Sequence, residues 1–136
     1  MRAPVWRDER GSAAVEFALV GPMLILLLIG MVVYGGWFWL AQSVQSLASE
    51  AARASIAGLD VAERTRLAQA YVQGHADDLA GLNPARIGLT VQTDADSIQV
   101  RILYDAHDHP VMALANLVPA PPSTIERTAV VRIGGY

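Results

Sequence analysis

Residues 11–41 read GSAAVEFALVGPMLILLLIGMVVYGGWFWLA, and this stretch decides how the chain is organised. No charged residue occurs between Phe17 and Ser49, and residues 17–41 are almost entirely apolar. A helix of that apolar length spans about 37 Å, enough to cross a hydrocarbon layer of about 30 Å with some tilt. A buried helix in a small domain is rarely apolar on every side over such a length. We therefore expect residues 12–41 to form a transmembrane helix.

The residues on either side of this segment predict its orientation. Arg2, Arg7 and Arg10 precede it, whereas Arg53 is the only basic residue close behind it. Because cytoplasmic flanks of membrane helices are enriched in basic residues, we expect a cytoplasmic N-terminus. The part of the chain after residue 41 is then expected outside the cytoplasm.

Aromatic residues gather at the C-terminal end of the apolar segment. Trp37, Phe38 and Trp39 are consecutive, and Tyr34 lies one turn earlier. Because amphipathic rings favour the headgroup level, we expect these residues at the membrane interface farther from the N-terminus.

The composition argues against several classes of function. Of 136 residues, 53% are hydrophobic and only 17% are charged, which leaves room for one small domain beside a membrane helix. The net charge of −3, without a basic block, argues against binding to nucleic acid through phosphate contacts. The chain has no cysteine, and it has no nucleophile or phosphate-binding motif. We therefore expect no enzymatic activity and no cofactor.

One short segment holds several potential metal ligands. Asp105, His107, Asp108 and His109 fall within it, and in an extended chain Asp105, His107 and His109 would share one face. Metal sites usually combine ligands from separate elements, and the sequence offers no second cluster. We therefore expect a solvated loop rather than a metal site, with a metal role as the alternative.

Glu16 is the residue that breaks the apolar pattern. A carboxylate at the edge of a membrane segment is costly unless it is paired or close to the headgroups. In the first turn of a helix, the macrodipole also favours it. A charged leader precedes this segment and ends at Gly11. If the chain is cut after Gly11, Glu16 becomes the fifth residue of the product.

This pattern resembles the N-terminus of type IV prepilins, and in particular that of the TadE-like pseudopilins of Tad (tight-adherence, or Flp) pilus systems. The resemblance rests on Gly11, on VEFAL at residues 15–19, and on Gly21-Pro22 before the Leu-rich residues 23–29. It covers about the first 30 residues, and the rest of the chain is similar only in layout.

The resemblance implies how the protein matures and assembles. A membrane prepilin peptidase would cut between Gly11 and Ser12, remove the leader (residues 1–11) and free the α-amino group of Ser12. Subunit helices would then bundle, with Glu16 and the adjacent Phe17 at the contact, and Glu16 facing the amino terminus of a neighbour. The implied protein is a minor pilin of the bacterial inner membrane, with a periplasmic domain and with TadE- and TadF-type pilins as partners.

Two other interpretations stay open. The chain could be an unprocessed, single-pass membrane-anchored periplasmic adaptor. Alternatively, its apolar segment could be a signal peptide that is cut after Ser43, which would release a soluble binding protein. The first residue of the mature protein distinguishes them: Ser12 for the pilin, Met1 for the adaptor and Val44 for the soluble protein.

Gly21 and Pro22 are expected to disturb the apolar helix. Pro22 lacks an N–H, so a carbonyl one turn earlier loses its partner, and Gly21 weakens the helix further. The pair predicts a kink or a locally melted turn. A proline tolerated within a straight membrane helix is the alternative.

The rest of the chain, residues 42–136, is expected to form an extracytoplasmic α+β domain. The helical period continues the first helix to about Ala57, with Gly58 as its cap. Asp60 begins a second helix, which Gly81 and Asn83-Pro84 end.

Alternating apolar residues predict an antiparallel sheet of about three strands in the last third of the chain. Residues 110–118, followed by three prolines, are expected to form a short helix or a loop. The expected strands are residues 87–92 and 98–104, joined by a turn, and residues 124–133.

The proposed cut can be tested at Gly11. A residue without a Cβ lets a peptidase hold the backbone extended, so replacing Gly11 with tryptophan is expected to block processing. N-terminal sequencing of the membrane-purified variant would then find Met1. Normal cleavage of the variant would contradict this cleavage site.

Overall fold

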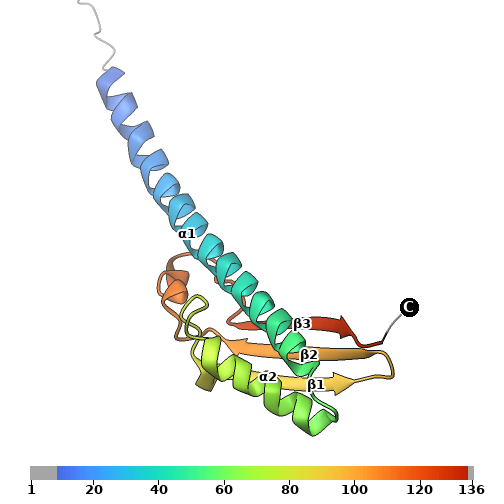
Figure 1. Ribbon diagram of the computed structural model, residues 1–136. Coiled ribbons are helices and arrows are strands. Elements are labelled where there is room, and N and C mark those ends of the chain that lie inside the picture. Colours follow the sequence, from blue (N-terminus) through green and yellow to red (C-terminus); the bar gives the residue numbers. More distant parts are fainter. Residues whose placement is uncertain (1–8, 135–136) are drawn as a thin grey trace, which may run out of the picture.

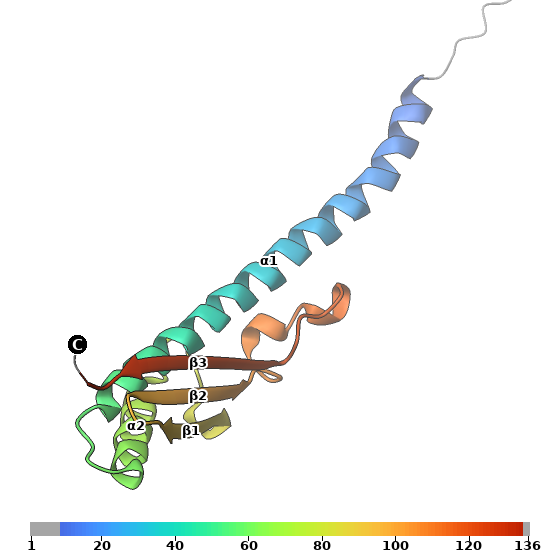
Figure 2. The ribbon, with the colours of Figure 1, turned by 90° about the vertical axis from the view of Figure 1, so that its right-hand side faces the viewer.

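The computed structural model describes residues 9–134, and in it one long helix projects from a small α+β domain (Figure 1). Leader residues 1–8, with Arg2 and Arg7, lie outside the described residues. The two ribbon views agree that about half of the long helix stands free while the other half lies along the domain (Figures 1 and 2). The expected α+β class is confirmed. The elements are α1 (Glu9–Ser55), α2 (Val61–His75), β1 (Ile87–Thr93), β2 (Ser97–Asp105) and β3 (Thr124–Arg132).

The three strands form an antiparallel sheet in the order β1-β2-β3. Val100 of β2 pairs with Val91 of β1 and with Ala129 of β3, which aligns apolar residues across the sheet. The turn between β1 and β2 closes with a 2.8 Å hydrogen bond from the Asp94 N–H to the Ser97 carbonyl. The predicted hairpin and third strand are therefore both present.

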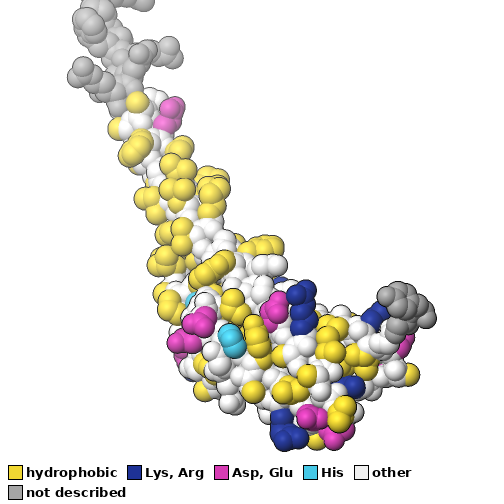
Figure 3. All heavy atoms as spheres, viewed as in Figure 1, with side chains coloured by type: hydrophobic (Ala, Val, Ile, Leu, Met, Phe, Trp, Pro, Cys, Tyr) yellow, Lys and Arg dark blue, Asp and Glu magenta, His cyan; other side chains and the backbone are white. Residues whose placement is uncertain are grey.

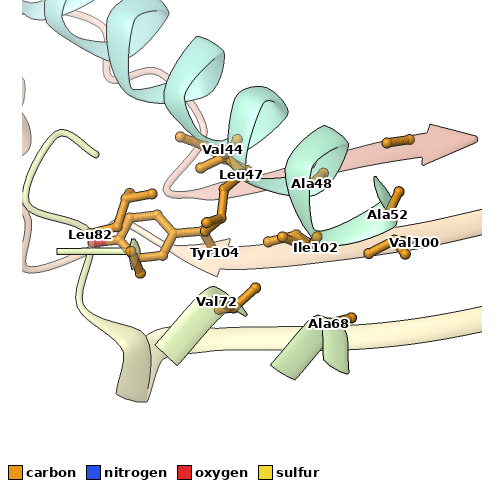
Figure 4. Packing of buried hydrophobic residues seen from close by; sticks show 14 of the residues in the cluster. Val44, Leu47, Ala48, Ala52, Ala68, Val72, Leu82, Val100, Ile102 and Tyr104 are labelled. Atoms are coloured by element: carbon orange, nitrogen blue, oxygen red, sulfur yellow. The ribbon is translucent and has the colours of Figure 1, made fainter. Parts of the chain in front are cut away.

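The hydrophobic core lies between this sheet and two helices that pack on one of its faces. α1 contacts β2 and β3, and α2 lies beside α1 and contacts β1. Figure 4 shows side chains of α1, α2 and β2 meeting in this layer. The opposite face of the sheet is open, and Val130 is 59% exposed there. Fully buried members of the core include Leu40, Val44, Leu47, Ala68, Leu82, Ile98, Val100 and Ile102.

The surroundings of α1 change near its middle. Residues 11–32 have no buried side chain, whereas Val33 is 1% exposed and begins a buried stripe that continues to Ser55. The stripe follows the helical period, so one side of the C-terminal half of α1 faces the domain. The expected continuation of the apolar helix into the domain is confirmed, and α1 ends two residues before the predicted Ala57.

α2 begins as the sequence predicts but ends earlier. The carboxylate of Asp60 accepts a 2.7 Å hydrogen bond from the Glu63 N–H, and the Glu63 side chain accepts one of 2.9 Å from the Leu59 N–H. This pair is a variant of the capping box, because Glu63 binds the N–H of Leu59, the residue before the N-cap, instead of that of Asp60. The regular helix ends at His75 rather than near Gly81. Residues 76–81 continue as turns, and Ala80 and Gly81, with left-handed φ of 59° and 65°, complete the reversal of the chain toward β1.

Gly58 has a different role from the predicted helix cap. Its backbone is not left-handed, so the cap geometry that favours glycine is absent. A Cβ at Gly58 would instead lie 2.7 Å from the Arg64 backbone nitrogen. The Arg64 Nε also donates a 3.0 Å hydrogen bond to the Gly58 carbonyl. Glycine is therefore required here because the start of α2 approaches the α1–α2 corner closely.

The close approach at Gly58 predicts a contrast between two glycine substitutions. Gly58→Ala is expected to destabilise the protein by about 1–3 kcal/mol, because the backbone of Arg64 must move. The matched control is Gly74→Ala, since a Cβ at this helical position meets nothing within 4 Å. It is expected to stabilise by about 0.5–1 kcal/mol. Thermal unfolding followed by circular dichroism measures both, and equal effects of the two changes would contradict the explanation.

Candidate functional site

The free helix segment, residues 11–32 of α1, is the most unusual surface of the molecule. Phe17 is 78% exposed and Met23 is 71% exposed, and nothing in the described part of the chain covers them. Figure 3 shows hydrophobic side chains along this projecting segment, whereas charged side chains gather on the domain. α1 is long and apolar enough to cross a membrane, with a mean hydropathy of 2.5 over its most apolar 18-residue window. Such a surface requires lipid or other apolar helices around it.

The predicted cleavage residues lie in the first turn of α1. Gly11 and Ser12 are exposed, and a Cβ at Gly11 would meet nothing within 4 Å. The bond between them is helical in this structure, whereas a peptidase requires an extended substrate. The first N–H groups of a helix have no intrahelical partner, so this turn can unwind at little cost.

Glu16 and Phe17 are both exposed and lie in the part of α1 that has no buried side chain. Among residues 11–134, the Glu16 carboxylate has no hydrogen bond or ion pair, so no side chain in that range occupies it. The Phe17 ring lies 3.9 Å from the position that a Cβ on Gly21 would take. This is an ordinary contact distance, so the Phe17 ring does not require glycine at residue 21.

The helix continues through Gly21 and Pro22. Every residue of α1 from Glu9 to Ser55 is helical, so no melted turn separates its two halves. The kink at Pro22 stays a prediction.

A second notable surface is the 106–123 loop, which connects β2 to β3 and contains η2 (Pro110–Met112) and η3 (Ala115–Leu117). Tyr34 of α1 donates a 2.9 Å hydrogen bond from its hydroxyl to the Pro119 carbonyl. The Trp37 Nε1–H donates one of 2.8 Å to the Pro122 carbonyl. Gly36 lets the loop approach, because a Cβ there would lie 3.1 Å from a Val111 methyl group.

The sequence did not reveal this docking. From the sequence, we interpret Tyr34 and Trp37 as membrane-interface residues. The glycines between them, Gly35 and Gly36, are a sequence signal that another segment can pack closely at this point. Their partners lie 85 residues away along the chain, a distance over which sequence periodicity carries no information. The predicted position at the membrane interface and the observed contact with the loop are compatible, because an aromatic side chain can hydrogen-bond to the protein at the level of the headgroups.

The acidic residues of the 105–109 segment bind an arginine. Arg86 Nη1 donates a 3.1 Å hydrogen bond to Asp105 Oδ2, and Arg86 Nη2 contacts Asp108 Oδ2. The His107 backbone N–H donates to Asp105 Oδ1 at 3.0 Å. This N–H and, after it, the Arg86 guanidinium hold the pKa of Asp105 below its ordinary value of 3.8. Asp105, His107 and Asp108 are exposed to solvent, as expected of a solvated loop, and the two aspartates also bind η1 (Pro84–Arg86) through ion pairs.

The imidazole ring of His109 forms hydrogen bonds with two backbone groups. Its Nδ1 accepts a 3.3 Å hydrogen bond from the Val111 N–H, so Nε2 carries the proton and donates to the Ala80 carbonyl at 3.0 Å. β2 ends at Asp105 and the chain then turns, so the shared face expected of an extended chain is absent. Among the described residues, no group of three or more potential ligands could hold a metal ion.

Comparison with known proteins points to the N-terminal helix. Residues 11–53 match the family model of TadE-like proteins. The match starts at Gly11, includes Glu16 and runs almost to the end of α1, which confirms the resemblance to TadE-like proteins over this part of the chain. TadE-like proteins are structural components associated with the Tad pilus, so the match supports a pilin-like protein rather than an enzyme. No curated protein and no solved structure matches the chain.

The contacts of Asp105 predict a pH-dependent contribution to stability. Because its pKa is lowered on folding, this contribution is present above its unfolded pKa of about 3.8 and is lost as the pH falls through the lower folded value. Asp105→Asn is therefore expected to be less stable than the wild type at neutral pH, and the difference is expected to shrink as the pH falls below about 4. Chemical denaturation over a pH series measures this difference.

Asp78→Asn is the matched control for this experiment. It makes the same charge change at an exposed residue that has no hydrogen bond or ion pair in the described part of the chain. It is expected to leave stability unchanged at neutral pH. A difference between wild type and Asp105→Asn that is independent of pH would contradict the assigned role of the carboxylate.

Proposed function

We propose that this chain is a pilin-like subunit of a Tad pilus system, anchored in the bacterial inner membrane by its free helix segment. The observation that carries the proposal is Glu16, a carboxylate without a partner among residues 11–134. It lies on an exposed apolar helix segment, within the part that matches TadE-like proteins. The basic leader places the N-terminus in the cytoplasm, and the domain of residues 42–136 then lies in the periplasm.

Processing after Gly11 creates the partner that Glu16 lacks. Prepilin peptidase removes residues 1–11 and leaves a positively charged α-amino group on Ser12. The exposed first turn of α1 supports this step, because unwinding it breaks no contact with the domain. In the mature chain, residues 12–41 begin with this amino group and contain a single carboxylate, that of Glu16.

Assembly then pairs these two charges between neighbouring subunits. The Glu16 carboxylate of one helix meets the Ser12 amino group of the next, and Phe17 packs beside this contact. An ion pair among apolar helices is favourable only when both partners are present, and removing one partner costs about 3–5 kcal/mol. The pair therefore fixes the register of the bundle, and the bend proposed at Gly21 and Pro22 adjusts the path of each helix.

The domain determines which subunits associate. Its core includes the C-terminal half of α1, so placing the helix in a bundle also fixes the position of the domain. A heterocomplex of TadE- and TadF-type pilins is the proposed assembly. In it, the domain contributes specificity and the free helix segment contributes the common contact.

The structure supports anchoring over release by a signal peptidase after Ser43. Residues 41–44 are helical, and Ala41, Ser43 and Val44 are buried against the domain. A cut at that point would remove Leu40 and Ala41 from the hydrophobic core. An anchored adaptor that is never cut is the remaining alternative, and the N-terminal sequence of the mature protein distinguishes it.

The proposal is tested by neutralising Glu16. Glu16→Gln is expected to reduce co-purification with other Tad pilins, and the yield of sheared pili, at least about tenfold, because the neighbour's amino group loses its partner. Immunoblots of membrane complexes and of sheared pili measure both quantities. Ser12 is expected as the first residue of the wild-type protein.

The matched control is Glu50→Gln, the same change on the same helix where α1 lies along the domain. Glu50 forms an exposed 3.5 Å ion pair with Arg53, and such pairs contribute little. This variant is expected to assemble normally. Normal association and normal pili in the Glu16→Gln variant would overturn the proposed assembly contact.

A further inference from the structure

The 106–123 loop lies at the level where α1 leaves the domain. Figure 2 shows this segment rising along α1 beyond the end of the sheet, toward the free helix segment. Its hydrogen bonds to Tyr34 and Trp37 fix it there. The free helix segment from Ser12 to residue 32 spans about 31 Å, close to the thickness of a hydrocarbon layer. The loop is therefore held where the helix emerges from the membrane.

The surface of the loop beyond Asp108 carries no charged side chain. No charged residue occurs from Pro110 to Ile125. Leu114 is 42% exposed and Leu117 is 56% exposed, and both lie in or beside η3. On α1, Phe38 is 70% exposed near the same level. The later part of the loop thus presents apolar side chains where charges would be costly in a membrane, whereas the exposed Asp105 and Asp108 lie before it, at the end of β2.

The backbone of the loop also suits a poorly hydrated environment. Four prolines at positions 110, 119, 121 and 122 have no N–H group to satisfy. Two of their carbonyls, those of Pro119 and Pro122, accept hydrogen bonds from Tyr34 and Trp37. Because these N–H groups are missing and these two carbonyls are already hydrogen-bonded, moving the segment out of water costs less free energy.

We propose that the tip of the 106–123 loop, with Leu114 and Leu117, inserts into the periplasmic lipid interface and holds the domain against the membrane. The occupant is lipid rather than a second protein, because the loop is continuous with the membrane-level part of α1 through its Tyr34 and Trp37 contacts. This inference rests on the proposed anchoring of the free helix segment. It adds a second membrane contact, which restricts the tilt of α1 before assembly.

The absence of cysteine from the chain makes a direct test simple. Single variants Leu117→Cys and Leu114→Cys, each labelled with an environment-sensitive fluorophore, are reconstituted as full chains at low protein-to-lipid ratio into phosphatidylethanolamine–phosphatidylglycerol vesicles. Quenching by lipids that carry a spin label near the headgroup is compared with quenching by aqueous iodide. Circular dichroism verifies that each labelled variant is folded.

Two control positions provide reference signals, one for a label inside the bilayer and one for a label in water. Leu28→Cys lies in the free helix segment and reports bilayer insertion, whereas Ala95→Cys lies in the exposed β1–β2 turn, at the opposite end of β2 from the loop. We expect lipid quenching at Leu117 and Leu114 to be several-fold stronger than at Ala95, and iodide quenching to be weaker.

The outcomes separate this inference from the proposed function. If the labels at Leu117 and Leu114 respond like the label at Ala95, or are shielded from both quenchers by protein, the inference is wrong. If the label at Leu28 also fails to respond to lipid, the proposed anchoring is wrong as well. If only the label at Leu28 is quenched by lipid, the result supports the proposed anchoring and contradicts only the second membrane contact.

Discussion

The packing of the C-terminal half of α1 onto the sheet is the interaction on which the rest of the structure depends. Leu40, Val44 and Leu47 are completely buried, and they occupy the centre of the only extensive core in the described residues. A sheet of three strands with one covered face is marginal alone, and α2 contributes few buried side chains of its own. The helix that leads to the membrane is therefore also the main structural support of the domain.

One helix consequently serves two environments, and the change occurs near Val33. Residues 17–32 are apolar on every side, and after Val33 one side of the helix is buried while the other carries polar residues from Gln42 onward. Because α1 is continuous, no break separates the free helix segment from the domain. In the proposed assembly, a contact between membrane helices at Glu16 would therefore also determine the arrangement of the domains.

The polar clusters of the domain support this architecture instead of forming a site of their own. Arg86 binds both Asp105 and Asp108, and His109 bonds to the backbone of the turn after α2. These contacts hold the beginning of the 106–123 loop, whose far end is held by α1. The residues that most resembled metal ligands in the sequence thus position a segment that lies beside the membrane helix.

The amino-acid sequence by itself determined the long apolar helix, the start of the second helix at Asp60, the strand hairpin and the motif around Glu16. Each of these depends on residues close together in the chain, where helical or alternating periodicity and capping preferences act. Only the tertiary structure decided why residue 58 must be glycine, where α2 ends, and what Tyr34, Trp37 and Arg86 bind. Those features arise where segments distant in sequence approach each other, and local sequence patterns do not predict such contacts.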